Sequence, residues 1–123
     1  MPPLALGKSM QPTDVYSVVF GDGERGSVQQ GQAVNGRARL KALYMQGVAN
    51  YNTYADGLIQ IRNGTSVSGD ALLKLMLPEG SGYCCNKYFK IPGNGILFDS
   101  GIFCDIEENV GSITLVVQGG ASA

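Results

Sequence analysis

The stretch IFCDIEENVGSITLVVQ, residues 102–118, decides the fold class of this chain. Both halves of it carry an apolar residue at every second position: Ile102, Cys104, Ile106, Ile113, Leu115 and Val117. This is the period at which successive side chains of a β-strand point to opposite faces of a sheet. Asp105 and Glu107 fall on the other face, where we expect solvent exposure and a blunted sheet edge. The stretch therefore predicts two strands, each with one face toward a core.

Six more segments, all closer to the N-terminus, are typical of short strands separated by turns. They are VYSVVF (15–20), RARLKALYMQ (37–46), GLIQIRNG (57–64), ALLKLMLP (71–78), NKYFKI (86–91) and ILF (96–98). The composition of residues 37–46 also suits a helix. Alternation favours a strand there, with one face formed by Ala38, Leu40, Ala42 and Tyr44. In residues 71–78 the same alternation sets Lys74 opposite a face formed by Leu73, Leu75 and Leu77.

The punctuation between these segments predicts how they are joined. Pro92 removes a backbone donor while Gly93 and Gly95 permit positive φ, so PGNG predicts a rigid corner. The connections leave no room for the crossovers that parallel strands need. We therefore expect an all-β fold, an antiparallel β-sandwich of jelly-roll-like form. Its 123 residues divide into an extended N-terminal arm (1–13), the sandwich domain (14–119) and a short tail (120–123).

Charge and hydropathy argue against nucleic acid and membranes as partners. Nine Lys and Arg residues face ten Asp and Glu residues, a net charge of -1, so no basic excess favours a phosphate backbone. No segment approaches the roughly 20 apolar residues of a membrane-spanning helix. Charged residues make up 15% of the chain, against an average of about 25%. This low proportion indicates that other subunits cover part of the surface.

The segment FGDGERG, residues 20–26, has the G-x-G-x-x-G spacing of a dinucleotide-binding turn and follows a predicted strand. Such a turn needs a helix directly behind it, but the following SVQQGQAVNG lacks a helical apolar stripe. Asp22 and Glu24 also place two carboxylates where a pyrophosphate would lie. We interpret the segment as a glycine-rich loop with an Asp-Gly turn, and we expect no cofactor.

Groups suited to catalysis are few. The chain has no histidine, so a Ser-His-Asp triad cannot form. Four acidic residues lie close together in the sequence: Asp99, Asp105, Glu107 and Glu108. A glycosidase needs two carboxylates in a cleft, whereas we expect Asp99 in a turn and Asp105 and Glu107 on a solvated face. The cysteines are too few for a structural zinc site and are interpreted as reduced structural thiols: Cys84, Cys85 and Cys104. We therefore expect neither enzymatic activity nor a metal.

Three segments carry a resemblance to a known group of proteins. They are residues 61–73, the run Ile91-Pro92-Gly93-Asn94-Gly95-Ile96-Leu97-Phe98, and the closing Thr/Val-rich strand at residues 113–117. Over residues 37–119 the chain resembles small β-sandwich virion structural proteins of tailed phages of marine and freshwater bacteria, including cyanophages.

The resemblance implies a non-enzymatic virion structural protein, most specifically a capsid decoration or cement protein that stabilises the phage head. It implies a homotrimer on the virion, assembled in the cytoplasm of the bacterial host. The implied partner is the major capsid protein or another virion structural protein. The N-terminal arm is then the candidate segment that grips the lattice, through Pro2, Pro3, Leu4, Leu6, Met10 and Pro12.

Two other functions fit the same sequence. A tail or head-to-tail connector component uses the same kind of sandwich. A carbohydrate-binding module of a receptor-binding spike is the second alternative, because several tyrosines lie in or beside predicted loops: Tyr44, Tyr51, Tyr54 and Tyr83. Tyrosine is also enriched at subunit contacts, so these residues suit an interface as well.

Overall fold

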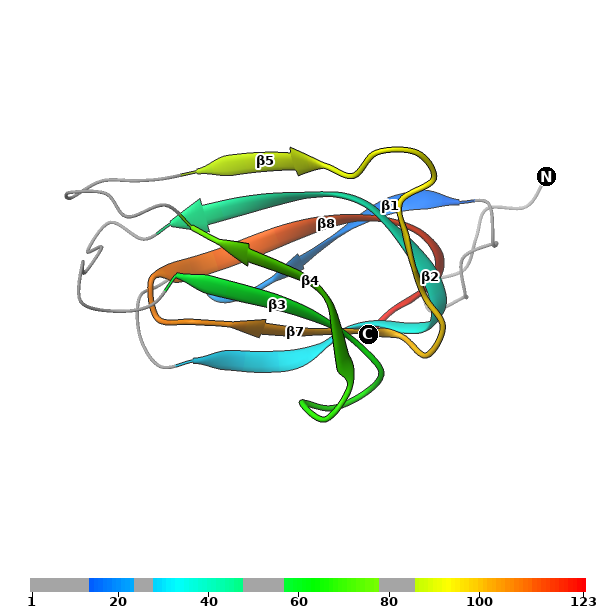
Figure 1. Ribbon diagram of the computed structural model, residues 1–123, viewed down its shortest axis with the longest axis horizontal. Helices are drawn as coiled ribbons and strands as arrows, with labels where there is room; N and C mark the ends of the chain where they lie inside the picture. Colours follow the sequence, from blue (N-terminus) through cyan, green and yellow to red (C-terminus); the bar gives the residue numbers. More distant parts are fainter. Residues whose placement is uncertain (1–13, 24–27, 48–56, 78–85) are drawn as a thin grey trace, which may run out of the picture.

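The computed structural model describes residues 14–23, 28–47, 57–77 and 86–123, and these residues form eight β-strands and no helix (Figure 1). The strands are β1 (Val15–Phe20), β2 (Gln29–Gly47), β3 (Leu58–Asn63), β4 (Asp70–Met76), β5 (Lys87–Lys90), β6 (Ile96–Phe98), β7 (Ile102–Ile106) and β8 (Val110–Ser122). Every pairing between them is antiparallel. The predicted all-β antiparallel fold is confirmed.

The strands form two layers because β2 belongs to both. The strand order is β1-β8-β2-β7-β3-β4, and β5 and β6 also pair with β2. Residues 29–34 of β2 pair with β7, and residues 38–47 pair with β8 on one side and with β5 and β6 on the other. Between these two parts, Val34 and Asn35 pair with the last residues of β8. We call β1, β8, residues 38–47 of β2, β5 and β6 the β8 layer. We call residues 29–34 of β2, β7, β3 and β4 the β7 layer.

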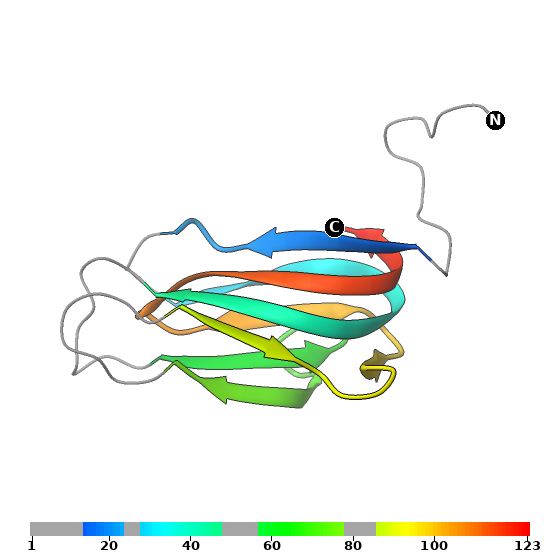
Figure 2. The ribbon, with the colours of Figure 1, turned by 90° about the horizontal axis from the view of Figure 1, so that it is seen from above.

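The core lies between these layers. Figure 2 shows β1 and the β3–β4 pair at opposite margins of the molecule, with the remaining strands between them. All the positions that the alternation in residues 102–118 assigned to the core have an exposed fraction of 0%: Ile102, Cys104, Ile106, Ile113, Leu115 and Val117. Each fully buried side chain of this size stabilises the fold by about 1.5–3 kcal/mol relative to an exposed one. The alternation therefore located one part of the core, to which β2, β3 and β6 also contribute.

A β-bulge changes which residues of β2 face the core. Its register with β8 shifts between Leu40 and Ala42. An extra residue in one strand of a pair reverses the alternation beyond it. Leu43 is consequently fully buried in the core, while Tyr44 lies on the outer face and is only partly buried. The predicted grouping of Ala38 and Leu40 with Ala42 and Tyr44 on one face is wrong for this reason.

Two strands are longer than predicted. β2 begins at Gln29 instead of residue 37, because its glutamine-rich first part pairs with β7. β8 continues to Ser122, which pairs with Val34, so the predicted tail at residues 120–123 is wrong. Gly119 and Gly120, with φ of 85° and 68°, mark an irregularity within the strand and not its end.

Two predicted turns are confirmed. In the glycine-rich loop after β1, residues 21–23 lie outside any strand, with φ of 110° at Gly21 and 83° at Gly23. The Pro-Gly corner joins β5 to β6, with φ of 66° at Gly93 and 80° at Gly95. The strands before and after this corner, β5 and β6, both pair with β2.

A single side-chain amide joins three segments where β2 leaves the β7 layer. The Nε2 of Gln32 donates to the carbonyl oxygens of Val34 (2.6 Å), Gly64 (3.0 Å) and Ile102 (3.2 Å). Its Oε1 is buried and has no hydrogen-bond partner. The amide thus cross-links β2, the turn between β3 and β4, and the start of β7.

Candidate docking face

The outer face of the β8 layer is built from residues that alternate with core positions. In β8, for example, Thr114, Val116 and Gln118 are partly exposed while the residues between them are fully buried. Register places their neighbours on the same face. We call the following set the β8 face: Val15, Ser17, Val19, Arg39, Ala42, Tyr44, Gln46, Tyr88, Lys90, Leu97, Ser112, Thr114, Val116 and Gln118.

Two rows of paired residues cross this face. One row runs Val19, Thr114, Tyr44, Tyr88, and the other runs Val15, Gln118, Arg39, Leu97. Directly opposed residues in an antiparallel sheet have Cβ atoms about 4.5–5.5 Å apart, so neighbouring side chains touch. The rows therefore make one continuous surface out of strands that are distant in the sequence.

Large apolar side chains on this surface are exposed. Val19 is 66% exposed, Tyr88 is 63% exposed and Val15 is 58% exposed. These three side chains are spread over the face, because Ser17 separates Val15 from Val19 and two strands separate Val19 from Tyr88. Tyrosine adds a hydroxyl to a rigid apolar ring, which suits a surface that passes from water into a contact.

The charges on the β8 face have one sign. Its fourteen residues include the cations Arg39 and Lys90 and no carboxylate. The chain as a whole has more acidic than basic residues, so this face departs from the average. Such a surface favours a partner that presents carboxylates, because opposite charges steer association and like charges oppose it.

A hollow of about 210 Å³ lies at one end of this face. It is lined by Arg37, Ala38, Arg39, Leu97, Gln118 and Gly119. In register, Arg39 lies between Gln118 and Leu97. The neighbouring Gly119 has no side chain to fill the space beside them. Within the part of the chain that the structure describes, neither arginine has a carboxylate partner. Two planar guanidinium groups beside an apolar wall can hold a carboxylate through charge-assisted hydrogen bonds.

The outer face of the β7 layer is different, because its polar groups bind one another. Asp105 lies between Gln30 and Gln60 in register, and its Oδ1 accepts a hydrogen bond from Gln30 Nε2 (3.4 Å). Its Oδ2 lies 3.8 Å from Arg62 Nε, an ionic contact too long for a hydrogen bond. Arg62 also donates from Nη2 to Gln60 Oε1 and from Nη1 to the carbonyl oxygen of Gly69 (2.9 Å). This network occupies the polar side chains in the middle of the face, while Leu72, Lys74 and Met76 of β4 stay exposed beside it.

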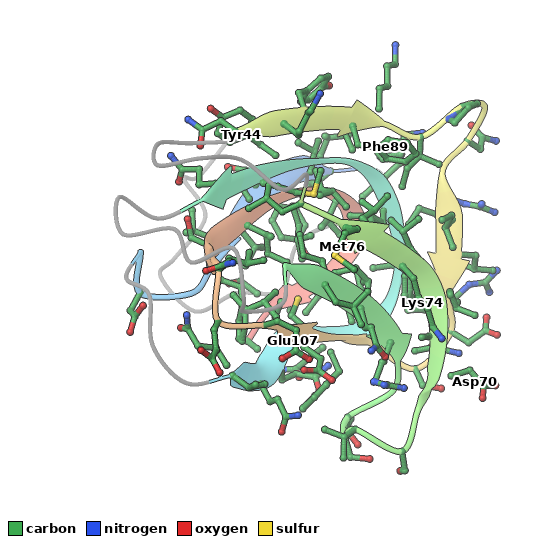
Figure 3. All side chains as sticks on the ribbon, turned by 60° about the vertical axis from the view of Figure 1, so that its left-hand side comes forward. Tyr44, Asp70, Lys74, Met76, Phe89 and Glu107 are labelled. Carbon is green, nitrogen blue, oxygen red and sulfur yellow. The ribbon has the colours of Figure 1, made fainter. Side chains whose placement is uncertain are left out.

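Figure 3 shows Tyr44, on the β8 face, near β5, and Lys74, on the outer face of the β7 layer, along β4. The predicted exposure of Asp105 is wrong: the residue is only 8% exposed. β7 lies inside the sheet, between β2 and β3, so the neighbouring strands cover this side chain and it blunts no edge.

The acidic residues considered as a glycosidase pair lie before, within and after β7. Asp99 lies in the turn before β7, Asp105 in the middle of that strand, and Glu107 and Glu108 just after it. Among the described residues, no group of three or more Cys, Asp or Glu side chains is arranged to hold a metal ion. None of the described segments forms a helix long and apolar enough to cross a bilayer.

Cys104 is a free, fully buried thiol in the core. Burial disfavours the charged thiolate and raises the pKa of this group to about 12. This agrees with the predicted structural role for Cys104. Cys84 and Cys85 lie outside the described residues, as do Tyr51, Tyr54, Tyr83 and the predicted lattice-gripping residues Pro2, Pro3, Leu4, Leu6, Met10 and Pro12.

Comparison with known proteins finds no family model and no curated protein that matches this chain. The resemblance to phage structural proteins therefore stays a prediction. The β8 face was not predicted as a site, although the alternation in SITLVVQ placed Thr114 and Val116 outward. Its rows depend on the register between five strands, which a single strand's pattern does not contain.

Proposed function

We propose that this chain is a non-enzymatic virion structural protein, a decoration protein that docks onto the capsid shell through the β8 face. One observation supports this role above the others: a continuous, partly apolar outer face that carries cations and no carboxylate. The resemblance over residues 37–119 supplies the virion setting. The shell protein is the proposed partner.

Docking through this face suits what a stabilising subunit must do. Burying exposed apolar side chains such as Val19 and Tyr88 against a partner stabilises the complex by about 25 cal/mol per Å² of apolar area removed from water. Arg39 and Lys90, on the same face, fix orientation by binding carboxylates on the shell. The two-layer fold behind the face keeps these groups in place, so little conformational entropy is lost on binding.

A second candidate function rests on a specific pair. Tyr44 and Tyr88 are directly opposed on neighbouring strands and face outward. Adjacent aromatic rings form a platform on which a sugar ring stacks, so a carbohydrate-binding role on a receptor-binding spike is the runner-up. It predicts that a glycan panel contains at least one sugar that raises the thermal unfolding temperature.

The test is co-sedimentation of the purified full chain with phage heads assembled without it. We expect Lys90→Glu to weaken binding by about tenfold or more, because it sets a carboxylate against an acidic partner. Lys74→Glu is the matched control, since Lys74 is an exposed strand lysine on the opposite layer and its reversal should leave binding unchanged.

The outcomes separate the alternatives. Equal binding by both variants shows that the β8 face is not the docking surface. A chain that ignores heads but joins purified tails, or that is stabilised by a glycan, has a different place on the particle. Binding that weakens as salt is raised is expected, because exposed charges are screened.

A further inference from the structure

The free edge of β1 offers a second binding surface beside the β8 face: the side chains of Val15, Ser17 and Val19 belong to that face, but their backbone groups do not. Among the described strands, β1 pairs with β8 alone and ends the strand order. Figure 2 shows it at one margin of the molecule. An edge strand exposes backbone donors and acceptors that can pair with another strand.

The direction of these groups follows from the ladder. The carbonyl oxygen of Asp14 accepts a hydrogen bond from the Gly119 amide (3.2 Å), in line with the register of β1 and β8. In an antiparallel pair, alternate residues direct both backbone groups to the same neighbour. Residues 14, 16, 18 and 20 therefore face β8, and the N–H and C=O groups of Val15, Ser17 and Val19 face the free edge.

This edge differs from the other edges in its lack of protection. β1 reads VYSVVF and contains no charge, proline or glycine. β4 carries Asp70 and Lys74, β5 begins and ends with lysine, and β6 has only three residues. Charged residues and short length are the devices by which proteins prevent unwanted strand pairing. Within the described strands, only β1 has neither device.

We propose that two copies of this chain pair antiparallel through β1, with Ser17 opposite Ser17 of the second copy. In this register Val15 lies opposite Val19 of the second copy, and Val19 lies opposite Val15 of the second copy. All three pairs then use backbone groups that face the edge, which gives six hydrogen bonds. A second copy is the favoured occupant because an uncharged strand meets no like-charge repulsion from itself, and its exposed valines cover each other.

The symmetry of this pairing determines the shape of the dimer. A two-fold axis through Ser17, normal to the sheet, turns both β8 faces to the same side. The dimer thereby presents one docking surface of doubled area, and both halves can bind a shell at once. The pairing closes at two copies, so it differs from the trimer that the resemblance implies.

The first test is the mass of the full chain by light scattering over a wide range of concentration. We expect twice the 13.0 kDa chain mass at high concentration. Val19→Lys should give a monomer, because it sets a charge on each side of the paired edge. Val67→Lys is the matched control, an exposed valine in the turn between β3 and β4, and it should remain dimeric. A wild-type monomer at all concentrations, or a trimer, overturns the proposal.

Amide hydrogen exchange resolves where the copies touch. In the dimer the amides of Val15, Ser17 and Val19 should exchange slowly, and they should exchange at least tenfold faster in Val19→Lys or on dilution. The amides of Tyr16 and Val18, which are bonded within the subunit, should be protected in both states. A dimer in which Val15 and Ser17 exchange as fast as in the monomer pairs through another surface, which also overturns the proposal. Both measurements stand independently of head binding.

Discussion

Two substitutions of Gln32 test whether its side-chain amide stabilises the fold through hydrogen bonds. Gln32→Glu keeps the size of the side chain but replaces the donating NH₂ group by an oxygen. That oxygen would lie among the carbonyl oxygens of Val34, Gly64 and Ile102, which now accept from Nε2. Gln32→Leu removes the amide and adds no charge. The two variants therefore distinguish lost hydrogen bonds from buried charge.

The magnitudes follow from these contacts. An NH₂ group has two hydrogens, so Gln32→Leu loses the equivalent of two good hydrogen bonds, each worth about 1 kcal/mol net. It also removes the unpaired Oε1, so we expect a loss of about 1–2 kcal/mol in the free energy of unfolding. Gln32→Glu leaves a buried carboxylate with acceptors around it, which costs about 3–5 kcal/mol at pH 7.

The pH dependence of Gln32→Glu has a definite sign. Burial among acceptors raises the pKa of the new carboxyl in the folded state above its unfolded value of about 4.3. Between these two pKa values the folded state binds more protons, so stability relative to wild type increases as pH falls. Below the unfolded pKa the protonated carboxyl donates one bond and most of the deficit is recovered.

Urea unfolding of wild type and both variants at pH 7 and at pH 4 provides the measurement. The expected order of stability at pH 7 is wild type, then Gln32→Leu, then Gln32→Glu. The gap between the two variants should narrow at pH 4. If Gln32→Glu lies within about 0.5 kcal/mol of wild type at both pH values, within the usual range of surface substitutions, the cross-linking role of the amide is refuted.

Three more predictions test the fold directly. Gly95→Ala should destabilise by about 3 kcal/mol or more, because φ is 80° and the new Cβ meets the carbonyl oxygen of Leu40, whereas Gly93→Ala, at a φ of 66° in open space, should cost about 1–2 kcal/mol; equal losses in urea unfolding contradict the close approach. Leu115→Ala should cost about 2–5 kcal/mol, and a loss below about 1 kcal/mol would show that the residue is not in the core. Cys104 should resist iodoacetamide at pH 8 in the folded chain and react after unfolding, as peptide mapping would show, because burial raises its thiol pKa to about 12.

Strands with a clean alternation were predictable from the sequence because each such strand has one face in the core. Leu73 and Leu75 pack against the core from β4, and Leu77 beyond it is fully buried, while Lys74 is exposed, as the pattern indicates. The Pro-Gly corner was predictable for a different reason, since its conformation is a local property of proline and glycine.

Features that depend on neighbouring strands were not predictable in this way. Gln30 and Gln32 gave no apolar signal, yet their segment is a strand because β7 supplies the ladder. The exposure of Asp105 depends on Gln30 and Gln60 beside it, and the faces of β2 depend on a bulge at Lys41. The composition of the β8 face likewise follows from register across five strands.

The membership of β2 in both layers affects how the molecule carries load. In a sandwich made of separate sheets, a pull that parts the layers is resisted by side-chain packing and by the loops that connect the sheets. Here the backbone of β2 runs without a break from its pairing with β7 to its pairing with β8, through Gly36, where φ is 82°. Tension that enters through the β8 layer therefore passes to the β7 layer along covalent bonds and two hydrogen-bonded ladders. The layers cannot separate until one ladder has been broken, so the sandwich should yield as one unit under mechanical stress.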